Sequence, residues 1–173
     1  YSGKIIWKKQ ATDLEHPAVW DENHIFNLNF KLSSQSMRVK FKQQMESSLS
    51  LNINRDSIGL EKHSKDNKNS SNIYQKKDIT LADSWHELTI KIAGKQIVIF
   101  IDNQKLIEAT DDSDPLGGYA LSGYAQINKV EVTDLSGKIL FKEPFKNLNS
   151  WSAQSGVKLE NNEIIIISSD EIK

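Results

Sequence analysis

The chain has 173 residues, and its 22 Lys and Arg against 23 Asp and Glu give a formal net charge of -1 at pH 7. A chain of this length can bury one adequate core, so we expect a single domain that spans residues 1–173. The near-zero charge argues against nucleic acid as a partner, and the lack of cysteine excludes disulfides, Cys-zinc sites and thiol nucleophiles. No apolar run is long enough for a membrane span.

Alternating hydrophobicity predicts three strands in the first part of the chain. Residues 26–32, 37–41 and 49–53 carry apolar side chains at every second position, with polar residues between them. This period of two is typical of strands with one buried face and one face in solvent. Residues 61–78 lack the pattern, and we expect a solvated loop or a loosely paired hairpin there. A short turn at residues 80–84 is the only helical feature that we expect.

A meander of strands joined by tight turns is predicted for the middle of the chain. Residues 88–92 alternate between apolar and polar, and Gly94 then reverses the chain. Residues 97–101 are continuously apolar, as in a strand that is covered on both faces. Asp102 and Asn103 follow, and both tolerate the positive φ angles that a two-residue hairpin turn requires.

This stretch, from Trp85 to residue 132, resembles the C-terminal half of the concanavalin A-like jelly-roll sandwiches. Laminin G-like domains and the bacterial domains related to 3-keto-disaccharide hydrolases share its pattern: a Trp that opens an alternating strand, a glycine turn, a hairpin like Ile101-Asp102-Asn103, and a strand that begins with Gly117-Gly118. Asn103 stands where those domains usually have Gly, and Asn also tolerates the left-handed region. The resemblance implies an all-β fold, a two-sheet antiparallel jelly-roll sandwich with little or no helix.

A short internal similarity links the two ends of the chain, because residues 2–8 (SGKIIWK) match residues 136–142 (SGKILFK). Residues 136–173 then either complete the same sandwich or start the next unit of a tandem array, and the match is also short enough to be a coincidence. This segment cannot bury a core alone. We therefore expect residues 163–168 to form a strand in this domain's sheet.

Patterns of known catalytic chemistry are missing from the sequence. There is no strand-borne carboxylate pair like that of jelly-roll glycoside hydrolases, no histidine spacing typical of a metal site and no nucleophile motif. His86 is therefore expected at the surface or the rim of the fold rather than in a metal site.

One acidic loop is a candidate metal site. Asp111, Asp112 and Asp114 could supply oxygen ligands to Ca²⁺, which binds at rim loops of many laminin G-like domains. The alternative is a cluster of Asx turns that ends at Pro115, and the irregular spacing of the carboxylates favours it. We expect no other cofactor.

Exposed aromatic rings and polar side chains are the candidates for ligand contacts. A sugar presents an apolar C–H face to an aromatic ring and a polar edge to amide or guanidinium groups. The predicted contact residues lie near strand ends or on a polar strand face that could form the floor of a concave sheet: Trp20, Asn27, Asn29, Arg38, Tyr119 and Tyr124. For each of them, packing in the core or simple solvation is the alternative. Trp7 and Trp85 lie within apolar alternations and are expected in the core.

The resemblance and the missing catalytic pairs together favour a non-catalytic recognition domain that binds glycan or polysaccharide. We expect it to belong to a larger bacterial protein outside the cytoplasm, in the periplasm, at the cell surface or secreted. One alternative is a glycoside-processing domain of the 3-keto-disaccharide hydrolase type, which would need a cleft with converging histidine and carboxylate groups. The other is a structural module that binds a protein partner.

Overall fold

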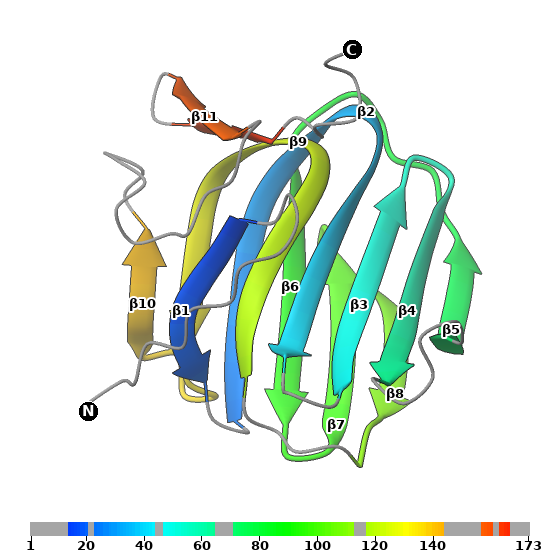
Figure 1. Ribbon diagram of the computed structural model, residues 1–173, viewed down its shortest axis with the longest axis vertical. Helices are drawn as coiled ribbons and strands as arrows, with labels where there is room; N and C mark the ends of the chain where they lie inside the picture. Colours follow the sequence, from blue (N-terminus) through cyan, green and yellow to red (C-terminus); the bar gives the residue numbers. More distant parts are fainter. Residues whose placement is uncertain are drawn as a thin grey trace.

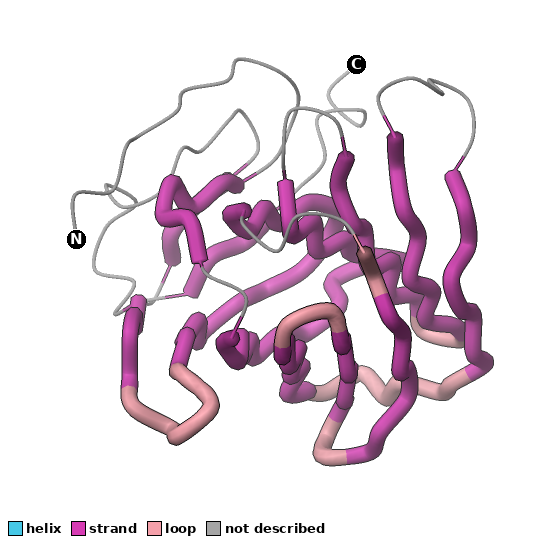
Figure 2. The backbone as a smooth tube through the Cα atoms, turned by 90° about the horizontal axis from the view of Figure 1, so that it is seen from below, coloured by secondary structure: helices cyan, strands magenta, loops and turns pink. Residues whose placement is uncertain are grey.

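The structure is a computed structural model that describes residues 14–20, 23–43, 47–64, 71–112, 117–143, 157–160 and 163–166. Within these ranges the chain forms strands, turns and loops, and none of it is helical (Figure 1, Figure 2). Among the same residues there is accordingly no helix suited to crossing a membrane. The strands are β1 (Leu14–Trp20), β2 (Asn23–Gln43), β3 (Ser47–Asn54), β4 (Ser57–Ser64), β5 (Ser71–Asp78), β6 (His86–Ala93), β7 (Gln96–Ile101), β8 (Gln104–Thr110), β9 (Gly117–Thr133), β10 (Ile139–Glu143), β11 (Val157–Glu160) and β12 (Glu163–Ile166).

Two long strands, β2 and β9, connect the two layers of a sandwich (Figure 1). They pair with each other along most of their lengths, from Ile25 opposite Thr133 to Gln43 opposite Gly118. On its other side β2 pairs first with β6 and then with β3. The front layer in the view of Figure 1 thus has the order β1-β9-β2-β3-β4-β5, and the back layer has the order β10-β9-β2-β6-β7-β8. The β11-β12 hairpin joins β9 between these two sets of partners.

The crossing between the layers is a bend in the middle of β2 and β9. The register between these strands shifts from Leu32 to Met37, so that the buried residues of β2 change from even to odd numbers. Gly123 of β9 lies at this point with a φ of 106°, where an L side chain is strained. An added Cβ would lie 2.6 Å from the carbonyl oxygen of Ser36 and 2.8 Å from the Cα of Met37. Only glycine fits this close approach without a shift of the backbone.

The core lies between the inner faces of the two layers. The alternation predicted for residues 26–32, 37–41 and 49–53 is confirmed, because the apolar positions of all three segments are buried. Full burial of a side chain of this size contributes roughly 1.5–3 kcal/mol. The largest fully buried side chains come from both layers: Phe26, Leu28, Phe30, Met37, Phe41, Leu49, Leu51, Ile53, Ile58 and Tyr119. The fold is therefore the all-β, antiparallel jelly-roll sandwich that the resemblance implies.

The predicted turns are confirmed, but the strand between them is not covered on both faces. Gly94, Asp102 and Asn103 have φ angles of 57°, 50° and 63°. In β7, Ile97, Ile99 and Ile101 are buried, whereas Val98 and Phe100 are only half-buried. The expectation of a strand with two covered faces is thus wrong, since only one side of β7 faces the core.

Two further expectations are wrong, and one alternative is confirmed. Residues 26–32 and 37–41 are parts of the single strand β2. Residues 61–64 and 71–78 pair as parts of β4 and β5, with a register shift between Leu60 and Glu61, which confirms the hairpin rather than the loop expected for residues 61–78. The edge strand β5 has residues 74–78 all exposed, so it carries no apolar alternation. Trp85 is 37% exposed rather than in the core.

The C-terminal segment adds to the same sheet. β12 pairs with β9, from Ile164 opposite Ile127 to Ile166 opposite Ala125, which confirms the strand expected at residues 163–168 for its described part. Residues 2–8, with Trp7, lie outside the described ranges. The choice between a completed sandwich and a tandem repeat stays a prediction.

Candidate functional site

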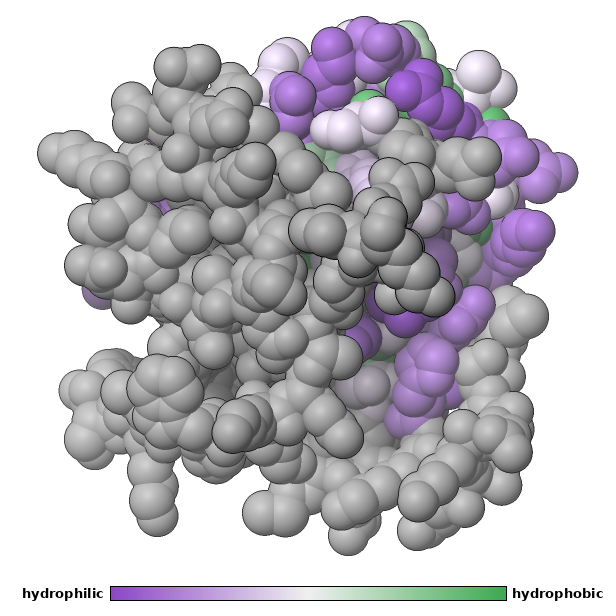
Figure 3. All heavy atoms as spheres, turned by 45° about the horizontal axis from the view of Figure 1, so that its top comes forward, coloured by the Kyte–Doolittle hydropathy of each residue, from purple (hydrophilic) through white to green (hydrophobic). Residues whose placement is uncertain are grey.

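A polar row crosses the outer face of the front layer. Antiparallel register places Arg38 of β2 opposite Asn52 of β3, Asn52 opposite Gly59 of β4, and Gly59 opposite Lys76 of β5. Gly59 contributes no side chain to this row, and the Lys76 side chain passes close to it. Figure 3 shows the described surface from the front and top as mostly hydrophilic.

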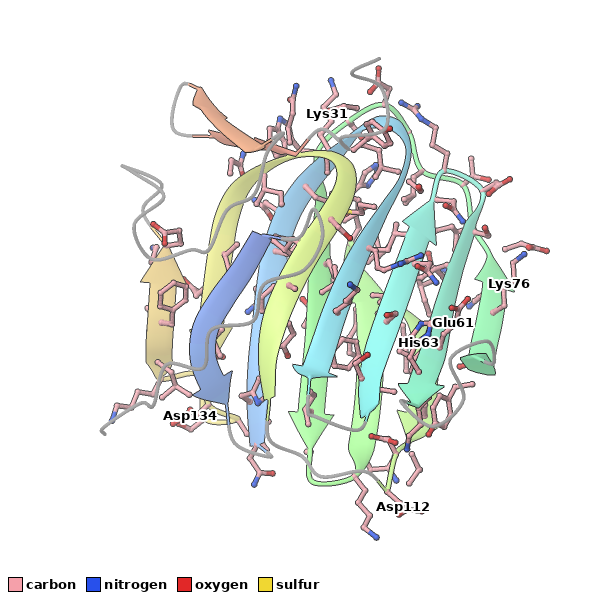
Figure 4. The ribbon with its side chains drawn as sticks, in the orientation of Figure 1. Lys31, Glu61, His63, Lys76, Asp112 and Asp134 are labelled. Carbon is pink, nitrogen blue, oxygen red and sulfur yellow. The ribbon has the colours of Figure 1, made fainter. Side chains whose placement is uncertain are left out.

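Donors and acceptors of this row are held by their neighbours. The Nε of Arg38 donates to the Oδ1 of Asn52 over 2.7 Å, which orients the guanidinium group along the sheet. Glu61 and His63 follow Gly59 in β4 by two and four residues, and the Nε2 of His63 lies 3.6 Å from the Oε2 of Glu61 (Figure 4). We call Arg38, Asn52, Glu61, His63 and Lys76 the polar face. It combines a guanidinium, an amide, a carboxylate, an imidazole and an ammonium group on three adjacent strands and the edge strand β5.

Ser50 of β3 lies next to the polar face, between Lys40 and Glu61 in register. Its side chain is fully buried, and its hydroxyl is the one buried side-chain N or O atom among the described residues that has no hydrogen-bond partner. Leaving such a group unpaired costs roughly 1–3 kcal/mol.

Asn27 and Asn29 lie on the opposite face of the sandwich from Arg38. The Thr89 hydroxyl donates to the Oδ1 of Asn27 over 2.9 Å, and Asn29 lies between Glu87 and Lys129, whose charged groups are 3.5 Å apart. The prediction that Asn27, Asn29 and Arg38 share one floor is wrong, because the bend in β2 carries its two halves to different layers.

Tyr119 is a core residue rather than an exposed platform. Its side chain is 2% exposed, and its ring stacks on Phe26 with centroids 4.0 Å apart. Its hydroxyl shares a hydrogen bond of 2.8 Å with the Nε2 of the buried His24. Burial raises the pKa of Tyr119 well above its ordinary value. The structure therefore corrects the prediction that Tyr119 contacts a ligand.

The other two predicted aromatic contacts stay predictions. Trp20 belongs to β1, where its backbone is opposite Gly117, and its side chain lies outside what the structure describes. Tyr124 follows the bend of β9 and is half-buried.

The described carboxylates of the acidic loop are paired with lysines. Asp111 is 1% exposed and accepts hydrogen bonds from the Nζ of Lys62 over 2.8 Å and from the hydroxyl of Tyr74 over 3.0 Å. The hydrogen bond to Asp111 raises the pKa of Lys62. Asp112 lies 2.8 Å from the Nζ of Lys95.

These pairs direct the two carboxylates to different partners, and Asp111 joins the end of β8 to β4 and β5. Asp114 is outside the described ranges. Within those ranges no three acidic or histidine side chains converge as a metal site. Calcium binding stays a prediction.

A cleft of about 260 Å³ opens at the rim between β5, residues 79–81 and the β7-β8 hairpin. His86 lines this cleft and is 8% exposed, so of the two positions expected for it, surface or rim, the rim position is confirmed. The Nδ1 of His86 lies 2.7 Å from the Oδ2 of Asp102, and the backbone N–H of Glu87 donates to the Oδ1 of Asp102 over 2.9 Å. Burial opposes ionisation of Asp102, but these hydrogen bonds outweigh it, so that the pKa of Asp102 is lowered.

The second ring nitrogen of His86 also faces an acceptor. Its Nε2 is 3.0 Å from the carbonyl oxygen of Ala82 and 3.4 Å from the hydroxyl of Ser84. A carboxylate and a carbonyl both accept, so the protonated ring satisfies both contacts and a neutral ring satisfies one. The role of Nε2 thus depends on the tautomer: a neutral ring that donates from Nδ1 to Asp102 leaves Nε2 as an acceptor toward the Ser84 hydroxyl, and a ring with a proton on Nε2 donates to the Ala82 carbonyl oxygen.

Comparison with known proteins bears on the fold. No protein-family model and no curated protein matches the sequence. Among solved structures, the carbohydrate-binding module CBM66 from Bacillus subtilis is similar over 65% of this chain and 74% of its own, with a TM-score of 0.54 and 12% identity. Chicken galectin 2 is similar over 70% of this chain and 98% of its own (TM-score 0.57, 10% identity), and galectin-Ib of Xenopus laevis over 69% and 98% (TM-score 0.57, 8% identity).

At these identities the likeness defines the fold class alone. The chain has the jelly-roll sandwich fold found in lectins and carbohydrate-binding modules. This agrees at a coarse level with the concanavalin A-like resemblance of residues 85–132.

Proposed function

We propose that this protein is a non-catalytic domain that binds carbohydrate on its polar face. The observation that carries the proposal is the polar face, in which Arg38 pairs with Asn52 across two strands and the contact between Glu61 and His63 lies further along the adjacent strand β4. Sugar hydroxyls both donate and accept, and the row offers guanidinium and amide donors beside a carboxylate acceptor. The galectins and CBM66 support this choice, because they place the same fold among lectins and carbohydrate-binding modules.

The setting of the domain is part of the same proposal. We place it in a larger bacterial protein outside the cytoplasm, where polysaccharides are accessible to a surface or secreted module.

Three groups of the polar face are charged, those of Arg38, Glu61 and Lys76, and hydrogen bonds to charged groups contribute roughly 1.5–3 kcal/mol each. Loss of one such bond should weaken binding about 10- to 100-fold.

Affinity electrophoresis against a panel of soluble polysaccharides tests the proposal. Arg38→Ala and Glu61→Ala should abolish the retardation that the parent protein shows. Lys91→Ala removes an exposed lysine from β6 in the back layer and is the matched control, which should keep full retardation. Parent protein that passes unretarded through every polysaccharide, or equal retardation of all variants, would contradict the proposal.

A further inference from the structure

The rim cleft has walls that are ordered before any ligand arrives. The N–H groups of Ile79 and Leu81 donate to the carbonyl oxygens of Asp56 and Arg55 over 2.9 and 2.8 Å, which anchors the segment between β5 and β6. The opposite wall is the β7-β8 turn, where Asp102 is held by its bonds from His86 and from the Glu87 N–H. A preformed site loses little entropy when it binds a small ligand.

The lining divides into an apolar floor and a polar edge. Leu81, Ile101 and Leu106 are buried and form the floor. Asp78, Thr80 and Gln104 are exposed at the edge, and none of these three side chains forms a hydrogen bond or ion pair with the described residues. The cleft therefore offers one apolar surface with uncommitted donors and acceptors around it.

The lining carries charges of both signs: Lys77 stands against Asp78, and the Asp102 carboxylate is already hydrogen-bonded to His86 and to the Glu87 N–H. The charges sum to -1 with a neutral His86 and to zero with a protonated one. An anionic ligand would therefore gain no net attraction in this site, and a cationic ligand would gain little. The lining favours a neutral ligand with an apolar face and a hydroxyl-rich edge, which is the chemistry of a sugar ring.

Size limits the ligand further. The volume of about 260 Å³ is below the roughly 300–1,000 Å³ of pockets that take drug-sized ligands. We propose that the cleft binds a single neutral sugar unit, so that the domain has an end-on site at its rim in addition to the polar face. The inference takes its ligand class from the proposed function, but it involves different residues on a different part of the surface.

Amide chemical-shift mapping tests this inference on the intact, ¹⁵N-labelled chain. The probes are the methyl glycosides of glucose, galactose, mannose and fructose, titrated to well above about 1 mM, the weak end of the affinity scale. At least one of them should shift the amides of Ile79, Leu81 and Gln104 in a saturable way. Gln104→Ala and Asp78→Asn should each weaken that binding about tenfold, while Arg38→Ala, on the polar face, leaves it unchanged.

The outcomes separate the two proposals. Saturable shifts at the cleft that survive Arg38→Ala support the rim site, even if no polysaccharide is retarded and the polar-face proposal fails. Polysaccharide binding that depends on Arg38, with no methyl glycoside shifting the cleft amides, overturns the rim site and leaves the polar-face proposal intact. Shifts that persist in full in both cleft variants, with unchanged spectra and melting temperatures, also overturn it.

Discussion

Substitution of Gly123 by alanine should be among the most damaging single changes in this protein. Gly123 lies where β9 crosses from the front to the back layer, and an alanine there would meet two separate penalties. Its φ of 106° is a conformation that L residues avoid, and its Cβ would lie 2.6 Å from the Ser36 carbonyl oxygen and 2.8 Å from the Met37 Cα. Both neighbours are backbone atoms of β2, so no side-chain rotation relieves the overlap.

The expected loss can be worked from these two terms. A sparsely populated backbone conformation costs about 1–3 kcal/mol. Overpacking against a rigid neighbour costs about 1–3 kcal/mol more. The sum of about 2–6 kcal/mol is a large share of the roughly 5–15 kcal/mol that stabilises a typical domain.

Urea unfolding of Gly123→Ala can be compared with two matched glycine variants. Gly94 has a φ of 57° and an open environment, so Gly94→Ala should lose only about 1–2 kcal/mol from its left-handed conformation. Gly59 has ordinary backbone angles and no neighbour closer than 3.9 Å, so Gly59→Ala should be neutral or stabilising by up to about 1 kcal/mol. Equal urea midpoints and equal m-values for Gly123→Ala and Gly94→Ala would refute the steric penalty assigned to the contact of Gly123 with β2.

Three other changes probe the buried polar contacts. Lys62→Met should cost about 2–3 kcal/mol in urea unfolding, because it removes the cationic partner of the 1% exposed Asp111, although the Tyr74 hydroxyl still donates to that carboxylate. Lys62 itself is 25% exposed, so the cost is less than that of breaking a fully buried pair; a double variant with Asp111→Asn that regains no stability would contradict this. Tyr119→Phe should cost about 1–2 kcal/mol by removing the hydroxyl that pairs with buried His24, and an unchanged midpoint would refute it. The pKa of Asp102 is lower in the folded protein than its ordinary value of 3.8. Asp102 therefore stabilises the fold fully at a pH above 3.8, and this stabilisation is lost as the pH falls through the lower pKa of the folded state. The difference in urea midpoint between the parent and Asp102→Asn should thus narrow on acidification, and a constant difference would count against the contact.

Much of the fold could be predicted from local sequence, because a strand with one buried face has apolar residues at every second position. Residues 88–92 and the Asp102-Asn103 turn are examples, since burial on one side and positive φ each restrict residue type directly. β5 left no such signal, because its exposed positions place no demand on hydrophobicity. The continuity of β2 through its bend was also hidden, since the register shift interrupts the alternation at that point.

The candidate sites were less predictable, for a different reason. Arg38 was identified, but Asn52, Glu61 and His63 are ordinary polar residues of solvent-facing strand positions until cross-strand register brings them together. The pairing of His86 with Asp102 did have a signal: a tight turn at Gly94 places residue 87 opposite residue 102. His86 precedes residue 87, so the same hairpin places its side chain next to the Asp102 carboxylate.

The sequence alone determined that the chain folds as an antiparallel β-sandwich, because alternation and turn residues are short-range constraints that every strand must satisfy. Which polar residues share a surface was decided only by the tertiary structure. The bend at Gly123 sends the two halves of β2 to opposite layers, and this separates Asn27 and Asn29 from Arg38. The same packing of the layers buries Tyr119 against Phe26. These outcomes depend on contacts between segments far apart in the chain, which no local pattern records.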